Sequence, residues 1–232
     1  MKPQPVPLKI LDVISILLFL AALAMVFLYA PLELTMNYVQ KIFYFHIANA
    51  WVGMLGFITA AVAGIIYLVR HDPDWDIIEL AAVEISLVFF LIAILSGSIW
   101  ARPSWGTYWT WEPRLTTAAI LEMIYIAYLL LRQGIDDPDR RARFSAVYTL
   151  IGSISVPITF LSIRLFRTIH PVIIGANSNT SQGSFDMSPR MLVTMFFTLG
   201  TFSVIFVTLF CHRIRLGRLA RLVEQRKLEE LR

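Results

Sequence analysis

The segment from Trp100 to Arg114 concentrates aromatic side chains to an unusual degree. Four of the six tryptophans of this 232-residue chain lie in it, namely Trp100, Trp105, Trp109 and Trp111. Indole rings offer flat apolar faces and one N–H donor each, so the cluster predicts a surface for a large planar ligand. The alternative is membrane anchoring, because tryptophans are common at membrane–water interfaces. Gly106, inside the cluster, permits close approach of the backbone.

Two of the four histidines flank this segment along the chain. His46 precedes it and His170 follows it, and span parity places both on the same side of a membrane. A lone interfacial histidine is more often a packed polar residue than a ligand. Two neutral imidazoles beside an aromatic platform, however, can occupy both axial positions of a haem iron. His71 and His212 fall on the opposite side.

Arginines on the same side as the tryptophans are suited to an anionic ligand. Haem carries two propionates, which arginine binds through charge-assisted hydrogen bonds. The sequence offers Arg114 first, and then Arg102 and Arg167, as propionate partners. Tryptophan rings would cover the faces of the porphyrin.

The composition indicates a membrane protein. Charged residues make up 16% of the chain and hydrophobic residues 57%, against about 25% charged in soluble domains. Six apolar stretches approach the roughly 20 residues that cross a bilayer as a helix. They are 10–30, 43–69, 77–100, 115–131, 145–163 and 191–211. We therefore expect an all-α membrane protein with six transmembrane helices in a single domain, 1–232, with an outer tryptophan-rich loop at 100–114.

The distribution of Lys and Arg predicts the orientation. Of the 20 such residues, six fall on the side of the tryptophans: Lys41, Arg102, Arg114, Arg164, Arg167 and Arg190. The others lie on the side of both termini, including a basic tail at 212–232. The positive-inside rule places this richer side in the cytoplasm. Both termini, and the tail, are thus predicted to be cytoplasmic, and the tryptophan-rich loop to face outward.

Several polar residues fall within or near the spans. Glu84 and Glu122 lie in the third and fourth spans, where a carboxyl group is costly and suggests either a function or a bond to a neighbouring helix. Asp12 and Glu79 are expected at the inner interface, and Pro157 is expected to kink the fifth span. Cys211 is the only cysteine, so no disulfide within the chain or CxxC pair is possible and histidine must provide most of any metal ligation.

Residues 105–117 read WGTYWTWEPRLTT. This run resembles the tryptophan-rich WGxxWxWD signature of haem-handling membrane proteins. Together with six spans and one histidine in each flanking outer loop, it makes the whole chain similar to the cytochrome c maturation protein C (CcmC) family. The chain departs from the signature at Glu112, where the family has Asp, so the carboxylate stands on a longer arm.

The resemblance implies a haem-transfer protein rather than an enzyme. It implies non-covalent haem b at the periplasmic face of a bacterial inner (cytoplasmic) membrane, with His46 and His170 as the axial iron ligands. The remaining haem-binding residues would be Trp100, Trp105, Trp109, Trp111, Glu112, Arg114, Arg102 and Arg167. The implied partners are the haem chaperone CcmE, which receives the haem, the CcmA/CcmB ABC transporter, CcmD and membrane lipid, with no nucleic acid.

Three other functions remain open from the residues. A haem lyase enzyme is one, although larger relatives with this signature carry more spans and more histidines. A bis-histidine b-type electron-transfer subunit is another, but such ligands usually lie on facing helices within the bilayer. A haem-exporting permease subunit would need energy from a partner, because the chain has no GxxxxGK[ST] phosphate-binding loop.

Overall fold

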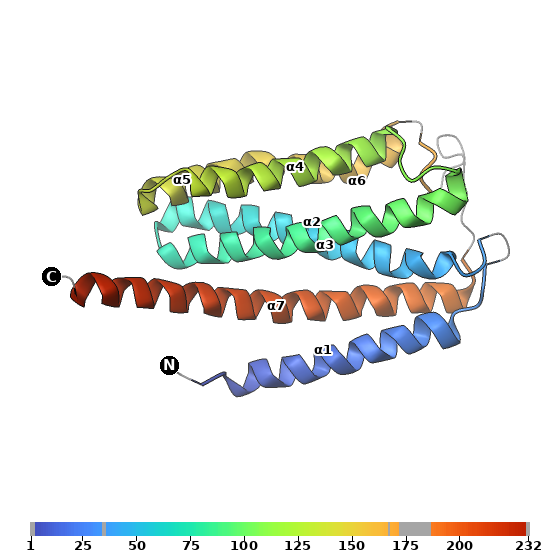
Figure 1. Cartoon of the computed structure of the whole chain (residues 1–232), viewed down its shortest axis with the longest axis horizontal. Coiled ribbons are helices and arrows are strands. Elements are labelled where there is room, and N and C mark those ends of the chain that lie inside the picture. The colour runs from blue at the N-terminus through green and yellow to red at the C-terminus, as the bar shows by residue number, and fades with distance from the viewer. Residues whose placement is uncertain (1–2, 34–35, 167, 172–186, 231–232) are drawn as a thin grey trace.

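The computed structural model describes residues 3–33, 36–166, 168–171 and 187–230, and this part of the chain forms a bundle of helices (Figure 1). The helices are α1 (Val6–Ala24), the π-helix η1 (Met25–Tyr29), α2 (Gln40–Arg70), α3 (Pro73–Trp105), α4 (Pro113–Gln133), α5 (Pro138–Gly152), α6 (Ser155–Leu165) and α7 (Pro189–Glu230). α2 and α3 form the centre, with α4, α5 and α6 on one side and α7 followed by α1 on the other.

Six segments of this bundle are long and apolar enough to cross a membrane. They are α1 with η1, α2, α3, α4, α5 with α6, and α7, which confirms the predicted all-α class with six spans. Both described ends of the chain lie at one end of the bundle, which we call the termini end (Figure 1). The opposite end, which carries Trp105 and Trp109, is called the tryptophan end.

The predicted loop at 100–114 is wrong at its beginning. α3 continues through Trp105, so Trp100 and Trp105 are helical residues, and the irregular segment starts only at Gly106. Gly106 has φ 76°, and its N–H bonds to the carbonyl of Arg102. A glycine in this left-handed conformation is a common helix terminator. The aromatic cluster is therefore anchored at one side on a rigid helix.

Pro157 divides the fifth span into two helices, as predicted. A proline lacks the N–H that would bond to the residue four positions earlier, and its ring clashes with that carbonyl. The carbonyl of Ser153 accepts instead from Val156 N at 3.1 Å, and α5 ends at Gly152. The helix is thus interrupted near the middle of the span, and α6 begins at Ser155.

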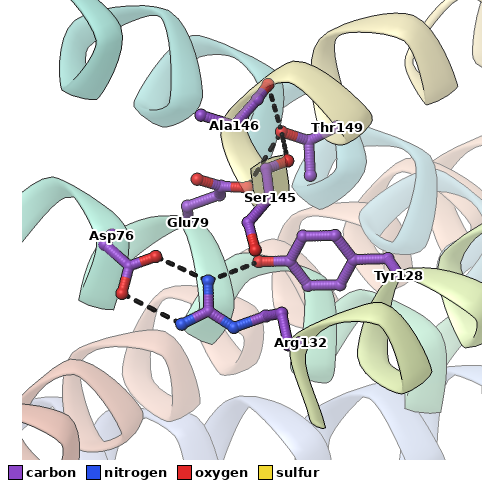
Figure 2. A network of polar contacts seen from close by, with 7 residues as sticks. All are labelled: Asp76, Glu79, Tyr128, Arg132, Ser145, Ala146 and Thr149. Carbon is purple, nitrogen blue, oxygen red and sulfur yellow. Dashed lines mark hydrogen bonds and ion pairs between the residues drawn. The ribbon is translucent and has the colours of Figure 1, made fainter. Parts of the chain in front are cut away.

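The termini end is held by ion pairs and buried polar contacts (Figure 2). Arg132 of α4 binds both carboxylate oxygens of Asp76 on α3, at 2.5 and 2.9 Å, and donates to the hydroxyl of Tyr128. Thr149 of α5 donates to Glu79 at 2.9 Å. Glu79 lies near the beginning of α3, as expected from the sequence, and is fully buried in the bundle with Thr149 as its partner.

The predicted basic tail continues α7 without a break to Glu230. Arg218 and Arg221 of this extension bind Asp74 in the first turn of α3, at 2.9 and 2.5 Å. Arg213 pairs with Glu84, which explains one of the two carboxyl groups found within the spans. The other, Glu122, is 6% exposed, and its Oε2 has no hydrogen-bond partner among the described residues.

Candidate functional site

A cavity of about 650 Å³ lies at the tryptophan end of the bundle, within the size range of small-molecule sites. Its walls come from α2, α3, α4, α6, α7 and the segments that follow α3 and α6. Six of the predicted site residues line it: His46, Trp100, Trp105, Trp109, Arg114 and His170. Trp111, Glu112 and Arg102 are not part of this lining, and Arg167 lies outside the described residues.

His46 is held in one orientation by α3. It lies in the second turn of α2, and its Nδ1 is 2.8 Å from the carbonyl oxygen of Ala93. A carbonyl oxygen can only accept, so Nδ1 carries the proton and Nε2 of the neutral ring carries the lone pair. Gly97 of the same helix makes room for the ring, because a Cβ there would lie 2.7 Å from His46 Cε1.

His170 meets His46 across the cavity. The two ring centroids are 6.3 Å apart and the ring planes cross at 85°. His170 also packs edge-on against Trp105, with centroids 6.1 Å apart. Burial, with Arg114 and His46 nearby, lowers the pKa of His170 from 6.5 to about 3. Its imidazole is therefore neutral at physiological pH, the form that binds metals.

The tryptophans form two pairs. Trp100 and Trp105 pack edge to face with centroids 5.4 Å apart, and Trp109 and Trp111 do so at 5.7 Å. Trp100 is buried, whereas Trp111 is 78% exposed. The indole N–H groups of Trp100 and Trp109 are buried without a hydrogen-bond partner in the described part of the chain. Because buried donors are usually paired, these two indicate a missing acceptor near the cavity wall.

Arg114 is the predicted arginine that reaches the cavity. Its Nη1 donates to the carbonyl oxygens of Thr159 at 2.5 Å and Phe160 at 3.3 Å, which ties α4 to α6. The guanidinium has five donors, so others remain for an anion. Arg102 instead donates to the carbonyl of Gly106 and lies over the ring of Tyr108.

Two further cations at the tryptophan end have contacts of their own. Lys41 is buried and donates to the carbonyls of Val26 and Ala30, around η1, at 2.6 and 2.7 Å. Arg190 lies over the ring of Tyr29. Both cations therefore contact residues in or beside η1, and neither is part of the cavity lining.

Glu112 lies at the junction between the tryptophan segment and α4. Its Oε1 accepts from the N–H of Leu115 at 3.0 Å, so Glu112 is the N-cap of α4. Pro113 follows at the first helical position, where its missing N–H has no cost. The other oxygen, Oε2, accepts from the hydroxyl of Thr168, two residues before His170.

The geometry of the two histidines suits one metal between them. With metal–nitrogen bonds of about 2 Å, two imidazoles on opposite sides of one ion have centroids roughly 6 Å apart. In the part of the chain that the structure describes, no group of three or more His, Cys, Asp or Glu side chains converges. The residues therefore fit a metal that already carries a planar organic ligand and takes two further ligands from the protein. They fit less well a metal bound by protein side chains alone.

Three supporting residues were not predicted from the sequence. Ala93 supports His46 through its backbone carbonyl, and Gly97 does so by having no side chain. Neither property can be recognised as a sequence motif. Thr168 could have been noticed, because a threonine hydroxyl often accepts a hydrogen bond from the backbone N–H two residues further along the chain, which here belongs to His170. Here His170 N is 3.0 Å from Thr168 Oγ1.

Comparison with known proteins gives a consistent result. The family model described as heme exporter protein C matches residues 5–229. The heme exporter protein C of Bradyrhizobium diazoefficiens is 36% identical over 181 residues, which cover 78% of this chain and 67% of that protein. That of Escherichia coli K12 is 30% identical over 199 residues, covering 86% and 78%. A putative cytochrome c biosynthesis ccmC-like mitochondrial protein of Marchantia polymorpha is 28% identical over 173 residues, covering 75% and 71%.

Proposed function

Because the chain belongs to the heme exporter protein C (CcmC) family of cytochrome c maturation, we propose that it holds haem b non-covalently between His46 and His170. On this proposal the protein is a multi-pass protein of the bacterial inner membrane, with its tryptophan end at the periplasmic face. It passes the haem to the chaperone CcmE.

The observation that carries the proposal is the meeting of His46 and His170. They are far apart in sequence and come from different elements, yet both line one cavity with ring centroids 6.3 Å apart. The edge-to-face contact of the two rings is a weak attraction that alone gives little reason to bury both histidines in one cavity. A shared iron gives it a purpose, since each ring supplies one axial nitrogen.

Each remaining residue has a defined task in holding the haem. The Nδ1–H bond of His46 to Ala93 fixes the tautomer that leaves Nε2 for iron. Trp105 and Trp109 provide apolar walls for the porphyrin, and Arg114 provides cationic donors for a propionate. The unpaired indole N–H groups of Trp100 and Trp109 are further donors for carboxylate oxygens.

Exposed aromatic residues beside the cavity support transfer rather than storage. Trp111 and Tyr108 are 78% and 60% exposed at the tryptophan end. Large exposed aromatic side chains are typical of protein contact surfaces. We assign this surface to CcmE, with the CcmA/CcmB transporter and CcmD as further partners of the complex. Chemistry on the haem edge then belongs to the chaperone, and the chain is a transfer scaffold.

The test is haem content and visible absorption of the purified protein. His46→Ala and His170→Ala should each lower haem content and shift the Soret band, and the double variant should bind little haem. His71→Asn is the matched control, because His71 lies at the termini end and Asn tolerates its left-handed φ of 54°. Unchanged haem content and spectrum in the double variant would refute the ligand assignment.

Transfer is tested separately by mixing the haem-loaded protein with purified CcmE. Trp111→Ala should slow movement of haem to the chaperone while the bound spectrum stays the same. If the protein alone forms thioether bonds on a CxxCH peptide, it is a lyase and the scaffold proposal is wrong.

A further inference from the structure

The segment that carries His170 is joined to the start of α4 by a chain of hydrogen bonds. The His170 N–H donates to Thr168 Oγ1 at 3.0 Å. The hydroxyl of Thr168 donates in turn to Glu112 Oε2, and Glu112 Oε1 accepts from Leu115 N at 3.0 Å. The carboxylate therefore binds the Thr168–His170 turn and the end of α4 at once.

This connection lies in a protected place. Thr168 is 5% exposed, so water competes poorly for its hydroxyl. The side chain of Glu112 caps the N-terminus of α4, where the backbone N–H groups and the partial positive charge of the helix attract an acceptor oxygen. Linked hydrogen bonds at low dielectric polarise and strengthen one another. Glu112 and Thr168 are not part of the cavity lining described above, so their effect on a ligand must pass through His170.

We propose that Glu112 and Thr168 are positioning residues that set the orientation of His170 toward the haem iron. This rests on the proposed function. The bond from Thr168 holds the backbone of His170 and so fixes where its ring starts. Loss of outer partners of metal-binding histidines typically costs about 10- to 100-fold in affinity. The motif carboxylate thus acts through backbone and hydroxyl bonds rather than by touching haem.

The decisive variant is Thr168→Val, which removes the hydroxyl at nearly constant shape. The full-length protein in detergent should release haem about 10- to 100-fold faster to excess apomyoglobin, with a changed low-spin iron spectrum. Thr168→Ser should restore both. Glu112→Ala should resemble Thr168→Val, whereas Glu112→Gln, which keeps an acceptor oxygen, should fall between it and the unmodified protein.

Thr198→Val is the control, because Thr198 is also buried and its hydroxyl donates within α7, to the carbonyl of Thr194 at 2.8 Å. A Thr168→Val protein with unchanged iron spectrum and haem release, beside an affected His170→Ala protein, would overturn the positioning role alone. An unaffected His170→Ala protein would overturn the proposed function itself.

A second, independent feature is an opening of the cavity in the side of the bundle. Trp51 of α2, Phe160 of α6 and Phe196 of α7 line the cavity and are also 45%, 53% and 56% exposed. Figure 1 shows α6 and α7 on opposite sides of the central helices. Residues that face both the cavity and the outside mark its mouth, between α6 and α7.

The mouth is open beside Gly200 and closed beside Ser203, both on α7. Gly200 of α7 lines the cavity, and an added Cβ there would have no atom within 4 Å. One turn further along α7, Trp51 Nε1 donates to Ser203 Oγ at 3.3 Å and bridges α2 to α7. α2 and α7 are long and apolar enough to cross a membrane, and in that setting the opening would face lipid chains.

We infer that haem reaches His46 and His170 sideways from the lipid, through the mouth beside Gly200. This also rests on the proposed function. The macrocycle of haem is apolar and planar and fits an aromatic-edged opening, while its two propionates stay toward the membrane surface. Side chains placed at Gly200 should hinder passage without touching the iron ligands.

The test measures Soret development after protein in liposomes is mixed with haem-containing phosphatidylcholine vesicles. Gly200→Leu and Gly200→Trp should slow loading progressively, with the final spectrum unchanged. Val207→Trp is the control, seven residues along α7 on the same face, at a residue that is 46% exposed and outside the cavity lining. Equal loading rates, or a changed final spectrum in the Gly200 variants, would overturn the route.

Discussion

At the residue scale, both proposed iron ligands are oriented through their protein surroundings rather than by sequence neighbours alone. His46 depends on the carbonyl of Ala93 and on the space beside Gly97. His170 depends on Thr168, and Thr168 on Glu112. A small change in these supports should therefore alter the iron without removing a ligand.

Gly97→Ala tests the first of these supports. The new methyl group would lie 2.7 Å from His46 Cε1 and 3.0 Å from Nδ1, so the ring must rotate away from Ala93. We expect haem affinity to fall by about 10-fold or more, although alanine favours the helix by about 1 kcal/mol. Haem titration and thermal unfolding check this together. Gly200→Ala is the control, since its Cβ meets nothing, and equal affinities of the two variants would contradict the account.

The neutral state of His170 gives a pH prediction for the haem-free protein. Its pKa is lowered from 6.5 to about 3, so the unfolded chain takes up this proton more readily. Stability should therefore fall as the pH drops from about 6.5 toward 3, and be unaffected above that range. Replacing His170 by Asn should remove this part of the dependence. Identical pH profiles of the unfolding midpoint in the two proteins would show that His170 is not buried in neutral form.

At the element scale, α4 connects the two ends of the molecule. Its first turn carries Glu112 and Arg114 of the site, and its last turn carries Arg132 of the ion-paired network. The first turn of α3 contributes Asp74 and Asp76 at this end. Their negative charge is favourable there, because the N-terminus of a helix carries partial positive charge. The termini end thus stabilises the bundle while the tryptophan end presents the cavity.

Arg132→Met should separate these two roles. Removing one member of a buried ion pair leaves Asp76 unpaired and costs about 3–5 kcal/mol. The unfolding midpoint in detergent should drop clearly, and Arg132→Lys should lie between, because lysine cannot make the bidentate contact. Haem spectra of the folded variants should remain unchanged. The exposed Arg226→Met should affect neither property, and an altered Soret band in Arg132→Met would show that the two ends are coupled.

At the scale of the whole molecule, the sequence predicted the spans because apolar runs of about twenty residues rarely form anything other than a membrane-spanning helix. It also predicted the kink at Pro157, and it named six residues that line the cavity. It did not predict that α3 extends to Trp105, because prolines such as Pro103 are read as helix ends. It did not identify the partner of Glu79, because Thr149 lies on another helix. His46 is supported by a backbone carbonyl and a glycine of another helix, and His170 by the linked side chains of Thr168 and Glu112. Contacts between separate elements of this kind become visible only in three dimensions.

The measurement that tests the central claim most directly is electron paramagnetic resonance of the ferric, haem-loaded protein. Two neutral imidazoles with planes crossing at 85° should give one six-coordinate, low-spin iron with the strongly anisotropic signal of perpendicular axial ligands. His46→Ala and His170→Ala should each abolish that signal. A high-spin signal in the unmodified protein, or a low-spin signal that survives both substitutions, would contradict haem binding between His46 and His170.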